Sequence, residues 1–143
     1  MELLDSHCHL DVTDFDVDRQ AVLQRARQKG VGGIVVPGID AVGWERLWQL
    51  CCSEPGLYPA FGLHPVFLQQ HTENDLSALQ TLLQRQRPVA VGEIGLDFHV
   101  DGLDKEAQQT LFEAQLLLAR DAGLPVILHV RKSHDQVLAT LKR

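Results

Sequence analysis

The sequence has few cysteines and no long apolar run. Its three cysteines, Cys8, Cys51 and Cys52, form no Cys-x-x-Cys pair, and adjacent cysteines on a helix are poorly placed to bond each other. A disulfide framework and a zinc ribbon are therefore excluded, and reduced thiols are expected. No segment approaches the ~18 apolar residues of a membrane span, and a basic start followed by an apolar run is absent. These absences predict a soluble, cytoplasmic protein without membrane contact.

Positive charge is also scarce. The 143 residues include 13 lysines and arginines against 19 aspartates and glutamates, a formal net charge of -6, with no basic stripe. Long-range attraction to a polyanion is not expected, so a nucleic acid would need a metal ion to supply much of the electrostatic attraction. The chain has neither a P-loop nor a Gly-x-Ser-x-Gly motif, which leaves nucleotide cradling and serine hydrolysis without support. No feature indicates a protein partner.

Strand-like and helix-like segments alternate along the whole chain, which has no low-complexity run or linker and is predicted to be one domain over residues 1–143. This alternation predicts an α/β fold with right-handed crossovers and a parallel sheet. After an apolar N-terminal strand, the expected strands are 32–37, 57–62, 89–92 and 125–129. The expected helices run from Asp14 or Asp16 to Lys29, over 44–51, around 76–83, over 105–122 and from 134 to 141. Trp44 and Trp48 are expected in the core.

The N-terminal strand ends in a His-x-His pair. Side chains alternate along a strand, so His7 and His9 should project to the same face about 6.5 Å apart, from where two imidazoles can bind one ion. Neutral imidazole is a common ligand of zinc and related metals. The alternative is that both histidines are solvated or capping residues.

Further polar residues follow the other predicted strands, where the ends of parallel strands share one edge. Glu93 alone could be a helix N-terminal or surface charge, His64 a loop residue and His129 a satisfied core histidine. Together with His7 and His9, however, they favour a shared cation, because polar groups at the ends of dry strands need partners. Glu93 has two oxygens and could bridge two ions.

Two more residues lie near this predicted site. Asp97 could orient a ligand histidine or cap the following loop, and both interpretations remain open. Arg131 lies just beyond His129 and could bind a phosphate with its forked guanidinium, although a solvated helix start would explain it equally well.

Four segments together resemble the TatD-like metal-dependent deoxyribonuclease and hydrolase family, most nearly its YjjV-type branch. They occur in the family's order and span the chain. They are Asp5-Ser6-His7-Cys8-His9-Leu10, Gly62-Leu63-His64-Pro65, Val91-Gly92-Glu93-Ile94-Gly95-Leu96-Asp97 and Pro125-Val126-Ile127-Leu128-His129-Val130-Arg131.

The resemblance implies a (βα)8 TIM barrel of the metallo-dependent hydrolase superfamily with two divalent metal ions, zinc, manganese or magnesium, at its mouth. His7 and His9 would hold one ion, Glu93 would bridge both as the catalytic carboxylate, and His129 would hold the second. We expect His64 and Arg131 to contact the substrate. The implied activity is 3′ to 5′ exonucleolytic cleavage of DNA by a metal-activated water.

The chain also departs from the family pattern. A barrel of this type needs ~250 residues, whereas about five βα units of an incomplete barrel are expected here. The family's histidine after the sixth strand and aspartate after the eighth have no counterpart. We therefore expect the N-terminal portion of a longer enzyme, truncated on its C-terminal side, that alone is poorly soluble or self-associating and is weakly active or inactive. Two alternatives remain, a metal-dependent hydrolase of a small amide, lactone or phosphoester, and a non-catalytic metal-binding fragment.

Overall fold

The structure, a computed structural model, describes residues 2–142 as five strands that alternate with helices. The strands are β1 (Leu3–Asp5), β2 (Val31–Pro37), β3 (Leu57–Phe61), β4 (Ala90–Asp97) and β5 (Val126–Arg131). The α-helices are α1 (Arg19–Gln28), α2 (Trp44–Ser53), α3 (Glu73–Gln86), α4 (Lys105–Ala122) and α5 (His134–Leu141). Two 3₁₀ helices, η1 (Thr13–Phe15) and η2 (Pro65–Gln70), precede α1 and α3. The predicted alternation of strands and helices is confirmed.

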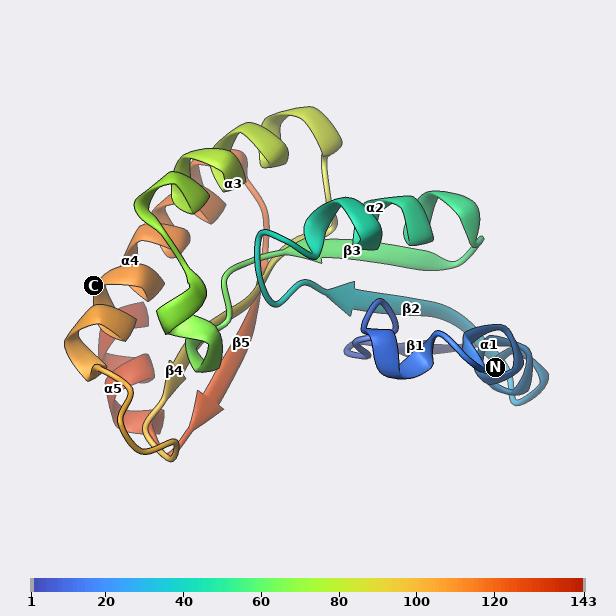
Figure 1. The fold of residues 1–143 in the computed structure, drawn as a ribbon, viewed down its shortest axis with the longest axis horizontal. Coiled ribbons are helices and arrows are strands. Elements are labelled where there is room, and N and C mark those ends of the chain that lie inside the picture. The colour runs from blue at the N-terminus through green and yellow to red at the C-terminus, as the bar shows by residue number, and fades with distance from the viewer. Residues whose placement is uncertain (1, 143) are drawn as a thin grey trace.

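All five strands are parallel and lie side by side in chain order, β1-β2-β3-β4-β5. This is the strand order of a (βα)8 barrel. Figure 1 shows the strands fanned into a curved sheet, with α2 against β3 and with α4 and α5 on the outer side of β4 and β5. Within the described residues, β1 and β5 each pair with one neighbour only, so the sheet does not close. The predicted incomplete barrel is confirmed.

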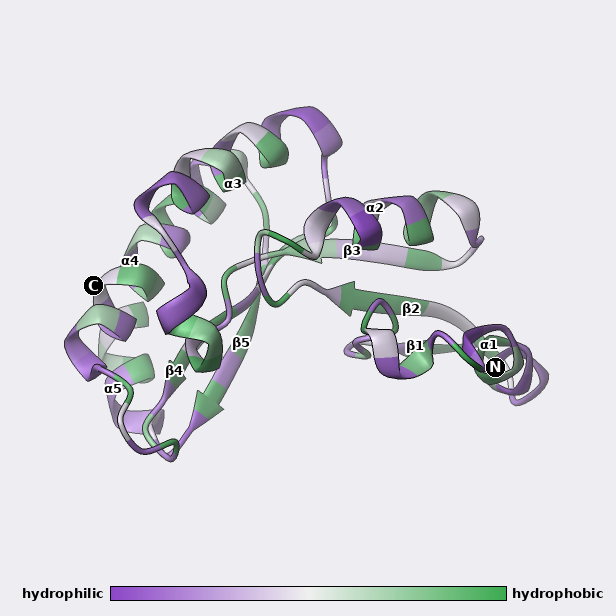
Figure 2. Cartoon of the chain, in the orientation of Figure 1, coloured by the Kyte–Doolittle hydropathy of each residue, from purple (hydrophilic) through white to green (hydrophobic). Residues whose placement is uncertain are grey.

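The core lies between the sheet and these helices. Figure 2 shows hydrophobic stretches along β2, β4 and β5, and helices that carry both hydrophobic and hydrophilic residues. Trp44 is buried and Trp48 packs against the core beside Phe61, as predicted for the two tryptophans. All three cysteines are free thiols. Among the described residues, the helices are too short or too polar to cross a membrane.

Helix α4 matches the predicted 105–122 to the residue. The carboxylate of Asp104 accepts hydrogen bonds from the amides of Glu106 and Ala107 and caps its N-terminus, and Gly123 ends the helix with a φ of 66°.

The predicted start of α1 and the predicted end of β4 are wrong. Helix α1 begins at Arg19 and not near Asp14 or Asp16, because the carboxylate of Asp16 pairs with Arg19 and Arg46 instead of capping a helix. Strand β4 continues to Asp97 instead of ending at Gly92, because hydrogen bonding to β5 resumes at Ile94 after an irregularity that begins at Val91.

Candidate metal centre

Glu93 lies in the middle of β4 and is 5% exposed. It falls at the interruption of the β4–β5 register, and its amide donates to the carbonyl of Gly38, just after β2. Close contact between β4 and β5 at this point depends on Gly95, which has a φ of 143° and where a Cβ would lie 2.1 Å from the carbonyl oxygen of His129. The glycine therefore allows β5 to bring His129 next to Glu93.

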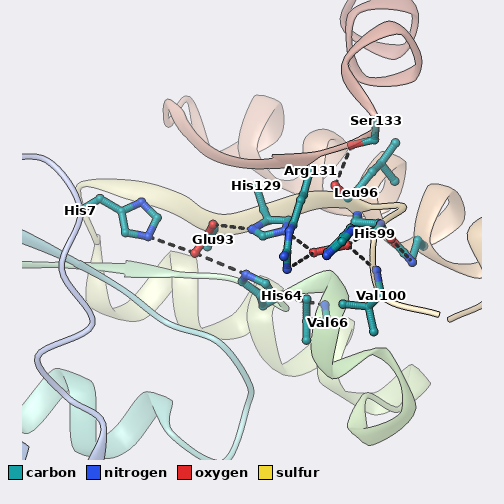
Figure 3. A network of polar contacts seen from close by, with 12 residues as sticks. His7, His64, Val66, Glu93, Leu96, His99, Val100, His129, Arg131 and Ser133 are labelled. Atoms are coloured by element: carbon teal, nitrogen blue, oxygen red, sulfur yellow. Dashed lines mark hydrogen bonds and ion pairs between the residues drawn. The ribbon is translucent and has the colours of Figure 1, made fainter. Parts of the chain in front are cut away.

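Four histidines surround the carboxylate of Glu93. Its Oε2 lies 3.0 Å from Nε2 of His7, 3.1 Å from Nε2 of His9 and 3.5 Å from Nε2 of His64. Its Oε1 lies 2.9 Å from Nδ1 of His129. Figure 3 shows the rings of His7, His64 and His129 turned toward this carboxylate from three different segments. The four residues predicted to share a metal site, His7, His9, Glu93 and His129, thus lie together.

His7 and His9 reach the site in a different way from the one predicted. Strand β1 ends at Asp5, so the two histidines follow the strand instead of lying on it. The amide of Cys8 donates to the carbonyl of Val35, which keeps the segment alongside β2. The Nε2 atoms of the two rings are 3.1 Å apart. The main-chain hydrogen bond between Cys8 and β2, which lies beyond the end of β1, therefore helps to bring the two imidazoles together as predicted.

The hydrogen bonds of His9 identify what can lie between it and Glu93. Its Nδ1 is 2.8 Å from the carbonyl oxygen of Pro37, which can only accept, so Nδ1 carries the hydrogen of the neutral ring. Nε2 then presents a lone pair to a carboxylate 3.1 Å away. Two acceptors attract each other only through a cation, either a proton or a metal ion. Accordingly, the hydrogen bond to Glu93 raises the pKa of His9, although partial burial opposes this.

His129 stands between two carboxylates. Its Nδ1 faces Oε1 of Glu93 and its Nε2 faces Oδ2 of Asp97, each at 2.9 Å. A neutral imidazole can donate only one of these hydrogen bonds, so the other contact again requires a proton or a metal ion. Burial lowers the pKa of His129, but the hydrogen bonds with Glu93 and Asp97 outweigh burial and raise it.

Asp97 has both of the roles that its sequence context left open. It is 1% exposed, and its Oδ2 holds His129 while its Oδ1 accepts hydrogen bonds from the amides of His99 and Val100. Burial raises the pKa of Asp97, but the hydrogen bonds from His129 and the two amides outweigh burial and keep it below its usual value. The carboxylate therefore orients His129 and caps the loop at once.

Glu93 remains ionised in this environment. Its burial favours the neutral form, but hydrogen bonds from His129, His64 and His9 hold the pKa of the carboxyl well below its ordinary value. A buried carboxylate surrounded by imidazole nitrogens is a donor set that suits zinc, manganese and related divalent ions. The residues present thus fit a divalent metal.

His64 differs from the other three histidines. It precedes η2, and its Nδ1 accepts a hydrogen bond from the amide of Val66 at 3.1 Å. The hydrogen of the neutral ring is therefore on Nε2, the atom that faces Glu93. That nitrogen is a donor, which suits a phosphate or carboxylate oxygen better than a cation. His71, which no sequence pattern indicated, fixes this loop by donating from Nε2 to the carbonyl of His64 at 2.9 Å.

Arg131 lies at the rim of the site. Its guanidinium is 3.9 Å from Oδ2 of Asp97, and its side chain is 53% exposed (Figure 3). The charge is thus next to the His129–Asp97 pair and remains accessible from solvent.

Known proteins resemble this chain over nearly its whole length. The family model described as "TatD related DNase" matches residues 4–143. The chain is 46% identical over 142 residues to "Uncharacterized metal-dependent hydrolase YjjV" of Escherichia coli K12, covering 98% of this chain and 55% of that protein. It is 35% identical over 141 residues to "3'-5' ssDNA/RNA exonuclease TatD" of Pantoea vagans, covering 98% of this chain and 54% of that protein.

A solved structure shares the fold. The crystal structure of YjjV, a TatD homolog from E. coli K12, superimposes with a TM-score of 0.95 at 46% identity, over 99% of this chain and 55% of that one. The chain therefore spans about half the length of the relatives that it matches.

Proposed function

The chain belongs to the TatD-related DNase family, and from this membership we propose that it carries the metal-binding part of a divalent-metal-dependent hydrolase that cleaves DNA phosphodiester bonds. The proposed reaction is exonucleolytic, in the 3′ to 5′ direction. Two less similar relatives are named as 3′-5′ exonucleases of single-stranded DNA and RNA, which supports this substrate class.

One observation carries the proposal: the two oxygens of Glu93 face different sets of imidazoles. Oε2 is within 3.1 Å of His7 and His9, while Oε1 is 2.9 Å from His129. A carboxylate arranged in this way can bridge two cations. We assign His7, His9 and Glu93 to a first ion, and Glu93 with Nδ1 of His129 to a second.

When bound, such ions lower the pKa of a water molecule and neutralise charge on phosphoryl oxygens. Mixed histidine and carboxylate ligands favour zinc or manganese over magnesium as the tightly bound species. The chain's own residues have simpler tasks. Pro37 and Asp97 each bind one nitrogen of a ligand histidine and thereby direct the other nitrogen toward Glu93.

We assign His64 and Arg131 to the substrate. The Nε2 hydrogen of His64 can be donated to a phosphate oxygen, and the exposed guanidinium of Arg131 can pair with phosphate as a fork. These positive or donating groups are local, which is consistent with a chain whose net charge is -6. Affinity for DNA should therefore depend strongly on the bound metal.

This chain alone should bind metal and cleave DNA weakly. It contributes three protein ligands to the first ion and two to the second, fewer than the four ligands of a closed zinc site. The relatives have about twice its length. Metal binding is therefore the more sensitive measurement.

Metal analysis of the purified chain tests the ligand assignment. Two equivalents of zinc or manganese are expected, falling to about one in His9→Ala and toward zero in Glu93→Ala. Unchanged metal content in both variants would refute the assignment. Arg85→Ala, on the exposed side of α3, is the matched control and should keep both ions.

A cleavage assay tests the substrate class. Single-stranded DNA labelled at its 5′ end should be shortened progressively in the presence of Mn²⁺, more slowly than by a relative of full length. Hydrolysis of a lactone or small phosphoester panel without any DNA cleavage would favour the small-molecule alternative.

His64→Ala separates the two roles of the surrounding histidines. If His64 contacts substrate, metal content stays at the wild-type value while the Kd for a phosphate-bearing ligand rises about tenfold. Loss of one metal equivalent would instead make His64 a ligand.

A further inference from the structure

Helix α4 contains two fully buried glutamines, Gln108 and Gln115. They are seven residues apart, which places them on the same face of the helix, two turns from each other. A buried amide is costly unless its oxygen and its nitrogen both find partners. The partners of these two side chains are therefore informative.

Each glutamine side chain binds both the amide and the carbonyl of a single residue. Oε1 of Gln108 accepts from the amide of Asp97 at 2.7 Å, and its Nε2 donates to the carbonyl of Asp97 at 2.9 Å. Oε1 of Gln115 accepts from the amide of Leu63 at 2.7 Å, and its Nε2 donates to the carbonyl of Leu63 at 3.1 Å. A neighbouring strand would make the same pair of bonds, so each side chain replaces a piece of sheet.

Strand pairing is missing at these two places. β3 and β4 pair only at Ala60 with Ala90 and at Phe61 with Val91. Beyond Val91, the side of β4 that faces away from β5 has no strand partner among the described residues. The two glutamines hold the ends of β3 and β4 in the region where the strands have separated.

The residues held in this way lead directly to the candidate centre. Asp97 contacts Nε2 of His129 at 2.9 Å. Leu63 precedes His64, whose ring lies 4.3 Å from that of His129, measured between centroids. The hydrogen bonds of Gln108 thus support a residue that holds a proposed metal ligand, and those of Gln115 support the residue before a proposed substrate contact.

We propose that Gln108 and Gln115 are positioning residues that act through the main chain, Gln108 on the metal ligand His129 and Gln115 on the substrate contact His64. The inference rests on the proposed function for these two histidines. Because both glutamines belong to one rigid helix, α4 sets the spacing between the metal-holding and substrate-holding parts of the site.

The test uses Gln108→Met and Gln115→Met in the 143-residue chain, because methionine keeps the length of the side chain and removes its hydrogen bonds. Zn²⁺ affinity is measured by competition with a chromophoric chelator, and binding of inorganic phosphate to the Zn²⁺-loaded chain is measured by calorimetry. Gln108→Met should weaken the second Zn²⁺ at least tenfold and leave the first within threefold. Gln115→Met should leave both Zn²⁺ affinities within threefold and weaken phosphate at least fivefold.

Phe112→Leu is the matched control. Phe112 is fully buried on the same helix between the two glutamines and belongs to the hydrophobic core. Phe112→Leu should lower stability and leave the affinities for both Zn²⁺ ions and for phosphate unchanged. If the two glutamine variants fold and weaken the second Zn²⁺ and phosphate equally, or weaken neither, the positioning roles are refuted. A wild-type chain that binds no Zn²⁺ would instead refute the proposed function.

If the glutamine variants fail to fold, hydrogen exchange of the unmodified chain still tests the proposal. Hydrogen exchange at the amides of Leu63 and Asp97 should be slow, as in a strand, because each amide is bonded to a buried glutamine. If the Gln108–Asp97 hydrogen bonds are coupled to the proposed metal ligand His129, Zn²⁺ should slow hydrogen exchange at the amide of Asp97 at least tenfold. Exchange at the amide of Leu47 in α2 should not change. Equal exchange at Asp97 with and without Zn²⁺ would overturn the proposal.

Discussion

The two sides of the candidate centre share one carboxylate but are built differently. On one side, His7 and His9 follow the three-residue edge strand β1, and their side chains are 35% and 30% exposed. On the other side, His64 and His129 are 9% and 19% exposed, and α4 packs against the neighbouring β4 and η2. The N-terminal side is held by contacts with β2, such as those of Cys8 with Val35 and of His9 with Pro37, whereas the other side is also supported by a helix and its buried amides. We therefore expect the two sides to differ in rigidity.

Glu93→Gln should have the largest effect, because it removes the charge that both sides share. An amide is uncharged and its nitrogen has no lone pair for a cation, so it cannot bridge two ions. We expect both ions to bind at least 100-fold more weakly, as measured by Zn²⁺ competition. Persistence of one tightly bound ion would show that the two sides do not share this ligand.

Comparing His129→Ala with His9→Ala tests whether the two sides of the candidate centre differ in rigidity. Each should remove one ion, but only His129→Ala takes a hydrogen bond from a buried carboxylate, Asp97, which keeps the guanidinium of Arg131 at 3.9 Å. Such a loss costs about 2 kcal/mol of unfolding free energy. His9 is more exposed, so its replacement should cost less than about 1 kcal/mol. Urea denaturation of both metal-free variants provides the measurement, and equal destabilisation would contradict the proposed difference in rigidity.

Leu4→Lys tests the exposed edge of the N-terminal side. Leu4 is 65% exposed on β1, which pairs only with β2 among the described residues. Unpaired apolar edges favour association, and an edge lysine opposes it. We expect the wild-type chain to self-associate and the variant to shift several-fold toward monomer in sedimentation velocity. Val42→Lys, which adds the same charge at a residue that is 93% exposed and lies outside the strands, is the control.

The smallest effect is expected at Asp16, which links the N-terminal side to α2. Hydrogen bonds from Arg19 and Arg46 lower the pKa of Asp16. A lowered folded-state pKa stabilises the protein above the unfolded-state pKa of about 3.9, and this contribution disappears as the pH falls through the folded-state value. Asp16→Asn should therefore lower Tm slightly at pH 7, and the difference from wild type should shrink as the pH falls below about 3.9 and vanish below the folded-state pKa. An unchanged difference at low pH would contradict the assignment.

Much of the fold could be predicted from local patterns. The helical spacing of apolar residues predicted α4 close to its observed bounds, and the structure shows that Asp104 and Gly123 cap its two ends. Patterns could not place the start of α1, because Asp16 bonds to Arg46, which is distant in sequence. They also missed the continuation of β4 past Glu93, which depends on pairing with β5.

The site was predictable to a similar degree. His7, His9, Glu93 and His129 were predicted as one cluster from the rule that ends of parallel strands share an edge, and they lie together around Glu93. Their assignment as metal ligands remains a prediction. Gln108 and Gln115 gave a weaker signal, two polar residues on the apolar face of a predicted helix. Their partners are main-chain atoms, which sequence patterns do not identify.

The close approach at Gly95 limits how this sequence can vary. Any side chain there would meet the carbonyl of His129 at 2.1 Å, and the backbone adopts a φ of 143° that other residues rarely reach. Even alanine would push β5 away from β4 and carry the imidazole with it. A saturation library at this codon should consequently yield a single functional amino acid, although the glycine itself touches neither ion nor nucleotide.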